Sequence, residues 1–432
     1  MLSPDALYPG IHGVVQAMGV ARSGAGEAGL ASLVTAVLLG QSLRRAELGR
    51  AQASKRSVPA RQRYLRVARG LTRPWLSSAE LTPHLIRAAL AVVDDPEPHL
   101  AMDTVRCGAW ESITVGVVWH GRVLPIGWAV LPYPWPKGAF TPAVTRLLWR
   151  IGAAWPAERR PHLVADRGFP SLALFRTLEQ LGWGWTIRLR ARLTVGVDGL
   201  ACPLRDLLAQ ARPGAWSCRA ITYGTGRQRV PGRLVLGRGD ALPLLPRHQA
   251  NPGSARQRRR QQVARQREVR GKHPTRRTSS AEQTDGWLIL FTSHPDWLPA
   301  SRSYTSRWST EGSYRDAQGG YDGRHGWDLE ATLARLTDPA IVDRVFGLWA
   351  LGSLLQSWTG HHLGAAHVPD AVREVRAHWT TSGRLSVWMR GRFALTDPST
   401  DLHAWLLQTL SDLAQRLRAA PLITSHPLVH AA

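Results

Sequence analysis

Two aspartates each follow an apolar, strand-like run, and both could help to hold a metal ion. Asp103 stands in the segment LAMDT (residues 100–104), and Asp166 stands in the segment LVADRG (residues 163–168). An acidic residue at such a place can simply begin a turn, and that interpretation stays open for either aspartate alone. Phosphodiester chemistry with two Mg²⁺ ions needs several carboxylates that converge on ions about 4 Å apart. If the two strands are neighbours in one sheet, both aspartates share one edge.

A third acidic residue, Glu311, lies in a run of polar groups with helical spacing. Tyr304, Arg307, Glu311, Arg315 and Gln318 follow one another in steps of three, four, four and three residues. This spacing predicts one helix over residues 304–318 that carries all five side chains on one side. An ordinary amphipathic helix with an Arg–Glu pair is the alternative.

The elements that must position the aspartates have an alternating α/β order. Runs rich in β-branched and aromatic residues predict three consecutive strands and then a helix–strand–helix–strand succession. Ser171 is expected to cap the second helix, and Gly182 is expected to stop it. The predicted strands are 99–105, 113–120, 123–131, 162–165 and 185–190, and the first helix is 143–153.

Residues 191–285 differ in composition, being rich in glycine, proline and arginine. Short strands are predicted at 216–222 and 233–236, and an apolar strand follows at 287–293. The segment 256–277 carries the densest run of arginine. Such a run either contacts nucleic acid directly or forms a solvated or disordered face.

The two flanks are predicted to be helical. Residues 1–92 contain a basic tract from Arg44 to Arg73, which suits a DNA-binding region. The glycines at 24, 26 and 29 match G-x-G-x-x-G, but no strand precedes them, so we expect only a loop between helices. Near the other end, residues 402–417 form an apolar helical stripe after a Ser399–Thr400 cap, expected to lie in the core or against a partner helix. His361, His362 and His367 lack a nearby acid at metalloprotease spacing and indicate a helix end or a turn.

Composition narrows the class of protein. The formal net charge of the 432 residues is +24, and all but three of the 55 basic residues are arginine. This excess points to a polyanionic partner, although a GC-rich coding sequence gives the same bias. Three widely spaced cysteines exclude a disulfide framework and a cysteine zinc site. With no targeting or membrane-spanning segment evident, a cytoplasmic protein is expected.

Together these motifs make the chain resemble the DDE transposases of the insertion-sequence-four family. The family's first aspartate is followed by threonine, as in Asp103-Thr104, and its second by arginine and often glycine, as after Asp166. The family signature Y-x2-R-x3-E-x6-K is matched by Tyr304, Arg307 and Glu311. Gln318 stands where the family has lysine; it loses a charge-assisted contact to phosphate, and Arg315 is expected to supply a cation on the same helix face.

The resemblance implies an α/β fold: an RNase H-like mixed sheet flanked by helices, interrupted by a β-rich insertion, with helical N- and C-terminal regions. It covers roughly residues 95–360. The expected parts are a basic helical region (1–92), the first part of the catalytic core (93–190), the insertion (191–285), the second part of the core (286–365) and a helical C-terminal region (366–432).

The implied activity is cut-and-paste transposition by metal-dependent DNA strand cleavage and strand transfer. Asp103, Asp166 and Glu311 would hold two Mg²⁺ ions, with Mn²⁺ as a substitute. Trp287 is expected either to stack on a flipped base or to lie in the core. The implied partners are terminal inverted repeats and target DNA, bound by at least a dimer. A non-catalytic DNA-binding relative and a nuclease that only cuts are the alternatives. The residues expected to contact DNA are Tyr304, Arg307, Arg315, Gln318, Trp287 and Arg167.

Overall fold

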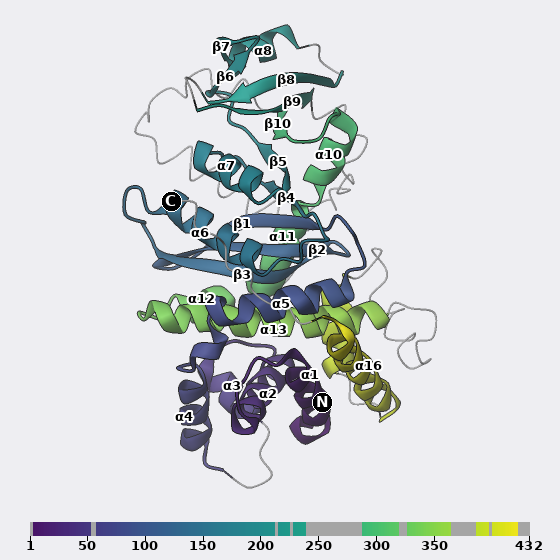
Figure 1. The fold of residues 1–432 in the computed structure, drawn as a ribbon. Coiled ribbons are helices and arrows are strands. Elements are labelled where there is room, and N and C mark those ends of the chain that lie inside the picture. The colour runs from purple at the N-terminus through teal and green to yellow at the C-terminus, as the bar shows by residue number, and fades with distance from the viewer. Residues whose placement is uncertain are drawn as a thin grey trace, which may run out of the picture. The chain divides into compact units, whose positions relative to one another are not determined.

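The fold is mixed α/β and divides into two compact units (Figure 1). The computed structural model describes residues 3–52, 58–211, 215–224, 228–238, 287–318, 326–363, 386–396 and 400–421. The basic run 256–277, Ser399 and His367 lie outside these residues. The first unit comprises residues 1–165, 176–183 and 306–432, and the second comprises 166–175 and 184–305. The chain therefore passes into the second unit after Ala165 and again after Trp183, and it returns to the first unit after Phe175 and after Thr305.

The sheet of the first unit begins with an antiparallel meander, as the sequence predicts. Its strands are β1 (His99–Cys107), β2 (Trp110–Trp119) and β3 (Arg122–Pro132), and β4 (His162–Ala165) pairs with β1 in parallel. The order is β3-β2-β1-β4. The turn between β2 and β3 uses positive φ angles at His120 and Gly121, as tight hairpins require. β1, which contains Asp103, and β4, which directly precedes Asp166, are thus neighbours.

Helices cover this sheet and extend beyond it. α5 (Ser78–Val92), α6 (Phe140–Ala153) and α13 (Pro339–His362) all contact β3, and Figure 1 shows α5 and α13 lying side by side beneath that strand. Most of α13 is buried, which is why its sequence is apolar around the whole helix. The helical prediction for residues 1–92 is confirmed for the described parts, 3–52 and 58–92. The remaining helices of the first unit are α1 (Pro4–Met18), α2 (Gly24–Gly40), α3 (Arg45–Ala51), α4 (Ala60–Gly70), a 3₁₀ turn (Pro74–Leu76), α11 (Trp308–Gln318), α12 (Leu329–Leu333), α15 (Val387–Thr396) and α16 (Thr400–Ala419).

Two expectations for the flanks have different outcomes. The glycine motif is not a loop: α2 begins at Gly24, and Ser23 caps it by accepting a hydrogen bond from the Gly26 N–H at 3.2 Å. The apolar stripe of α16 lies in the core, as expected, because Leu406, Leu410, Leu413 and Leu417 are fully buried. α16 packs against α1, where a Cβ at Gly10 would lie only 2.8 Å from the Leu410 side chain.

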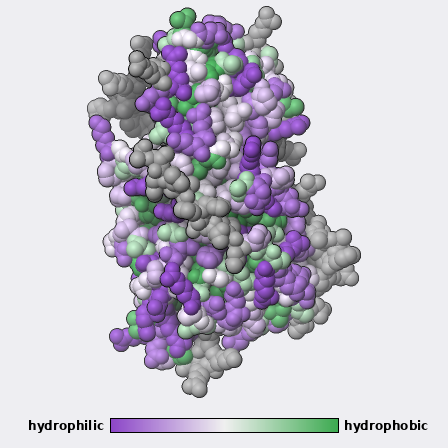
Figure 2. All heavy atoms as spheres, viewed as in Figure 1, coloured by the Kyte–Doolittle hydropathy of each residue, from purple (hydrophilic) through white to green (hydrophobic). Residues whose placement is uncertain are grey.

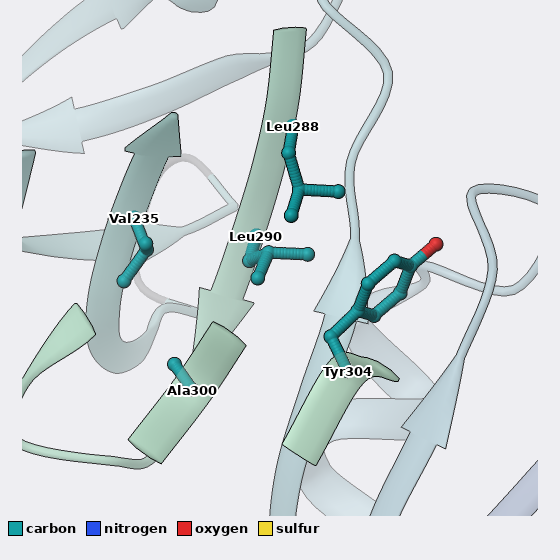
Figure 3. Close-up of a cluster of buried hydrophobic side chains, with 5 residues drawn as sticks. All are labelled: Val235, Leu288, Leu290, Ala300 and Tyr304. Carbon is teal, nitrogen blue, oxygen red and sulfur yellow. The ribbon is translucent and has the colours of Figure 1, made fainter. Parts of the chain in front are cut away.

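The second unit is a mostly β structure with strand order β5-β10-β9-β8-β6-β7. β10 is antiparallel to both β5 and β9. One apolar cluster of this unit joins Val235, Leu288, Leu290, Ala300 and Tyr304 (Figure 3). The elements are β5 (Gly184–Arg188), β6 (Thr194–Val197), β7 (Leu200–Pro203), α8 (Leu204–Gln210), β8 (Ser217–Tyr223), β9 (Val230–Arg238), β10 (Trp287–Thr292) and α10 (Trp297–Thr305), while α7 (Leu172–Gln180) contains a boundary between the units.

The surface and the helices of the described residues show few features that suit a membrane. Figure 2 shows hydrophilic residues over much of the visible face, with hydrophobic ones scattered among them. No single helix among the described residues is long and apolar enough to cross a bilayer. The pair α2 and α3, bent by 100°, meets that criterion only in combination, by length and composition.

Candidate active site

The signature segment 304–318 is two helices and not the single helix that its spacing predicts. α10 ends at Thr305 in the second unit, and α11 begins at Trp308 in the first. Thr305, the last residue of α10, donates its Oγ1 hydroxyl proton to the carbonyl of Arg302 at 2.6 Å. Hydroxyls that bond to nearby backbone compete with a continuous helix. The five signature side chains therefore do not share one helix face.

α11 is anchored to the meander of the first unit by polar contacts. Ser313 Oγ accepts a hydrogen bond from the backbone N–H of Val123 at 2.8 Å, and Asp316 accepts one from Arg122 Nε at 2.5 Å. The hydroxyl of Tyr314 is hydrogen-bonded to that of Thr114. The contacts of Ser313 and Tyr314 are buried and that of Asp316 is partly buried, so a lost partner would leave a poorly solvated polar group. They orient the whole helix, including Glu311.

Asp103 lies inside β1, next to the first turn of α11. Its Oδ2 accepts a hydrogen bond from Thr310 Oγ1 at 2.9 Å, and its Oδ1 accepts one from the Thr104 N–H at 2.8 Å. The Tyr314 hydroxyl also reaches the Asp103 carbonyl at 3.5 Å. Complete burial, reinforced by the Asp103 charge, raises the pKa of Tyr314 well above its usual value, so this phenol stays neutral.

Arg307 connects Asp103 and Glu311. Its Nη1 lies 3.4 Å from Asp103 Oδ2, and its Nη2 lies 2.9 Å from Glu311 Oε1. The guanidinium side chain is only 6% exposed, whereas the Glu311 side chain is 43% exposed. A cation placed between two carboxylates offsets their mutual repulsion. The Arg–Glu pair that the alternative interpretation expected is present, and the same arginine also binds Asp103.

The signature residues of α11 beyond Arg307 are at least partly exposed. Glu311, Arg315 and Gln318 follow one another at four and three residues, so they share one side of α11. Arg315 is exposed, and Gln318 is half-buried. Arg315 therefore lies one turn beyond Glu311 on the same side of α11, as expected.

Asp166 begins the second unit directly after β4. Its Oδ1 accepts a hydrogen bond from the Tyr304 hydroxyl at 3.3 Å and lies 4.0 Å from Arg188 Nη1. The Asp166 carbonyl also accepts a bond from the Phe169 N–H at 3.2 Å, so the aspartate does begin a turn, as the simpler interpretation requires. The side chain remains one-third exposed and free to make further contacts.

Tyr304 holds its hydroxyl in place through its ring. The ring is 2% exposed and packs on Leu290 and its neighbours in the apolar cluster. Figure 3 shows the hydroxyl oxygen pointing away from the aliphatic side chains. The ring thus supplies packing energy, and the hydroxyl supplies a donor to Asp166.

The two remaining residues expected to contact DNA lie at the surface or near it. Arg167 is exposed, and its carbonyl accepts a hydrogen bond from Arg190 Nε at 2.9 Å. Trp287 is half-buried at the first position of β10 and is not a member of the apolar cluster formed by Leu288 and Leu290. By strand alternation its side chain lies on the other face of the sheet from those leucines.

The parallel pairing of β1 and β4 relates the two aspartates. Its register runs from His99 with His162 to Met102 with Ala165. Asp103 and Asp166 are the next residues in their respective segments. The sequence condition that the two strands be adjacent is therefore confirmed.

The acidic side chains of the site are candidate ligands for a metal ion. Among the described residues, no group of three or more His, Cys, Asp or Glu side chains is close enough to hold an ion. Asp103 and Glu311 nevertheless offer carboxylate oxygens, the ligand type that Mg²⁺ prefers. Both carboxylates form an ion pair with Arg307. The donor chemistry of these carboxylates fits Mg²⁺.

Sequence reasoning missed two polar neighbours of the aspartates. Thr310 directly precedes Glu311 and donates to Asp103, and Arg188 faces Asp166 from the end of β5. Arg188 is the one charged residue in the run 185–189 and was a readable signal, because a charge in a strand usually has a partner. Thr310 gave no comparable signal.

Comparison with known proteins does not assign this chain to a family. No model of a protein family matches the chain, and no curated protein shows significant similarity to it.

Proposed function

We propose that this chain is a DDE-type DNA transposase that moves an insertion sequence by cleaving and joining DNA strands. The observation that supports this most is the β1–β4 register, whose last pair precedes Asp103 and Asp166 by one residue each. Arg307 contacts both Asp103 and Glu311, so the first and third acidic residues share one cation. The chain's net charge of +24 suits a DNA substrate.

The finer fold assignment belongs to the same proposal. We infer an RNase H-like core that contains β1 to β5 and α11, with residues between β5 and β10 as a β-rich insertion. Support comes from the position of β6, β7, β8 and β9 in the chain between those two strands. The helical flanks would serve to bind the terminal repeats.

In this proposal Asp103, Asp166 and Glu311 would hold two Mg²⁺ ions, or Mn²⁺ in their place. Such ions, when bound, activate water and stabilise charge on the phosphodiester. Arg307 keeps the Asp103 and Glu311 carboxylates from repelling each other, and Thr310 orients Asp103. Tyr304 orients Asp166. Arg315, Gln318, Arg167 and Trp287 would contact DNA, whereas the Arg307 guanidinium is nearly buried between two carboxylates. At least a dimer would hold two element ends in the bacterial cytoplasm.

The test uses the full chain, MgCl₂ and labelled DNA that includes the segments flanking its coding region. Asp166→Asn should reduce strand nicking by at least about 100-fold, because several kcal/mol of charge stabilisation are lost. DNA binding should persist. The matched control is Asp198→Asn, a highly exposed aspartate in the turn between β6 and β7. Nicking that survives in Asp166→Asn would remove this residue from the site.

The same assay separates the alternatives. DNA binding without nicking in the wild-type chain would indicate a non-catalytic DNA-binding relative, for which Gln318 in place of lysine is the specific observation. Nicking without joining of strands would indicate a nuclease. Nicking and joining that both depend on Asp103, Asp166 and Glu311 are the result that the proposal requires.

A further inference from the structure

A pocket of about 530 Å³ lies in the first unit, away from the candidate active site. It is bordered by β3, α5, α6 and the first turn of α13, and none of its lining residues belongs to the set of acids and signature residues described above. Its apolar wall includes Val130, Leu131 and Leu147. This volume lies within the range of about 300–1,000 Å³ that is typical of small-molecule sites.

Two arginines from α6 line this pocket. Arg146 and Arg150 are four residues apart, so they lie on the same side of the helix. Burial lowers the pKa of Arg150, the nearby Asp343 charge raises it, and the Arg146 charge lowers it again. α6 contains no acidic residue, and neither arginine forms a salt bridge with a carboxylate of the described part of the chain. Asp343 offsets one of these two like charges, and an added anion would offset the other.

The one acid in the pocket wall, Asp343, is already bound to other groups. Its carboxylate accepts hydrogen bonds from the backbone N–H of Ser78 at 3.2 Å and from Trp128 Nε1 at 2.6 Å. Arg150 Nη1 instead donates to Ser78 Oγ at 3.1 Å, which fixes the direction of its guanidinium. The pocket therefore has a positively charged side with a formal excess of one charge.

We propose that this pocket binds the phosphate ester of a nucleotide. Arg146 and Arg150 would bind the phosphate, because a guanidinium matches phosphate geometry. Val130, Leu131 and Leu147 would contact the sugar or base. The nucleotide is either a free one or part of a DNA strand, and both sources offer the same chemistry. This inference goes beyond the proposed strand cleavage, since the pocket contains none of the three acids.

The first test measures binding of dAMP and of inorganic phosphate to the full chain by calorimetry without divalent metal. Arg146→Gln should weaken dAMP binding about tenfold, the loss expected for one charge-assisted contact. Arg418→Gln, on the exposed last turn of α16, removes the same charge and should leave dAMP binding unchanged. Equal weakening by both variants would overturn the specific site. Succinate binding as tightly as dAMP would overturn the assignment to phosphate.

A second arm addresses DNA as the source. If dAMP does not bind, Arg146→Gln should still weaken binding of a short DNA duplex about tenfold more than Arg418→Gln does. Absence of dAMP binding together with equal effects of the two variants on DNA binding would overturn the proposal. Neither readout involves cleavage, so failure of the pocket and failure of the transposase proposal are distinguishable.

A third measurement needs no variant. The wild-type chain is treated with an arginine-selective dicarbonyl reagent in the presence and absence of dAMP or DNA, and modified peptides are quantified by mass spectrometry. Arg146 should be protected several-fold by the bound nucleotide, and Arg418 should not be protected by dAMP. Equal modification of Arg146 with and without either ligand would contradict the proposal.

Discussion

The two units hold their acidic residues by different physical means. In the first unit, Asp103 and Glu311 are held by charge, through the nearly buried guanidinium of Arg307. In the second unit, Asp166 receives its hydrogen bond from Tyr304, whose ring is fixed by apolar packing, and its arginine partner is 4.0 Å away and partly exposed. One signature motif thus supplies an electrostatic contact in the first unit, through Arg307, and a packing contact in the second unit, through Tyr304.

The largest expected effect tests the packing side of this comparison. Tyr304→Ala should lower the free energy of unfolding of the second unit by about 3–5 kcal/mol, because a fully buried ring is removed from the cluster with Leu288 and Leu290. Tyr304→Phe keeps the ring and should cost less than about 1 kcal/mol. Urea unfolding measures both variants. Similar losses in the two would mean that the hydroxyl, and not the ring, stabilises this region.

The electrostatic side is tested by Arg307→Gln. Removing the guanidinium leaves Asp103 and Glu311 without their shared cation and should cost about 3 kcal/mol, the lower end for a buried pair, since Glu311 is partly solvated. The matched variant Arg188→Gln removes the distant partner of Asp166 and should cost less than about 1 kcal/mol. Thermal unfolding compares them. Equal costs would abolish the distinction between the two units.

A smaller effect is expected from Thr310→Val, which keeps the side-chain shape. The variant removes the hydroxyl that donates to Asp103 and should lower stability by about 1 kcal/mol. Thr145→Val, at an exposed hydroxyl of α6, should change it by less than about 0.5 kcal/mol. If urea midpoints of the two variants coincide, Thr310 does not fix the Asp103 carboxylate.

The smallest effect concerns acid. Burial, with help from His120, His362 and nearby arginines, lowers the pKa of His361 to about 4, below its unfolded value near 6.5. The unfolded chain therefore takes up a proton first, so this contribution to stability is present above pH 6.5 and is lost as the pH falls toward 4. Hydrogen exchange in α13 should accelerate over this window in the wild type and less so in His361→Gln. His12→Gln is the control, and the same acceleration in every variant would exclude His361 as the cause.

Much of the fold near the aspartates follows from local pattern. β4 begins and ends at the predicted residues, His162 and Ala165, because a short apolar run bounded by turn residues has few alternatives. The hairpin between β6 and β7 was missed in a region rich in glycine, although its Asp198-Gly199 turn, with positive φ at both residues, is a readable signal. The many glycine, proline and arginine residues of this region obscured the alternation typical of strands.

The candidate site was less predictable than the strands. The steps between Tyr304 and Glu311 fit one helix, but the chain bends after Thr305, where no glycine or proline marks a break. Tyr304 belongs to the apolar cluster of one unit, whereas Arg307 binds carboxylates of the other. Tertiary contacts of this kind override local helical spacing. For the same reason the role of Thr310, which depends on a residue 207 positions away, had no local signal.

The places where the chain passes between the units have a consequence for how its length can vary. Two such passages, after Ala165 and after Thr305, fall directly at the candidate residues. A single added or deleted residue there would separate Asp166 from the strand register, or Tyr304 from Arg307, by a whole peptide unit. Natural length variation should therefore be confined to segments other than these two passages.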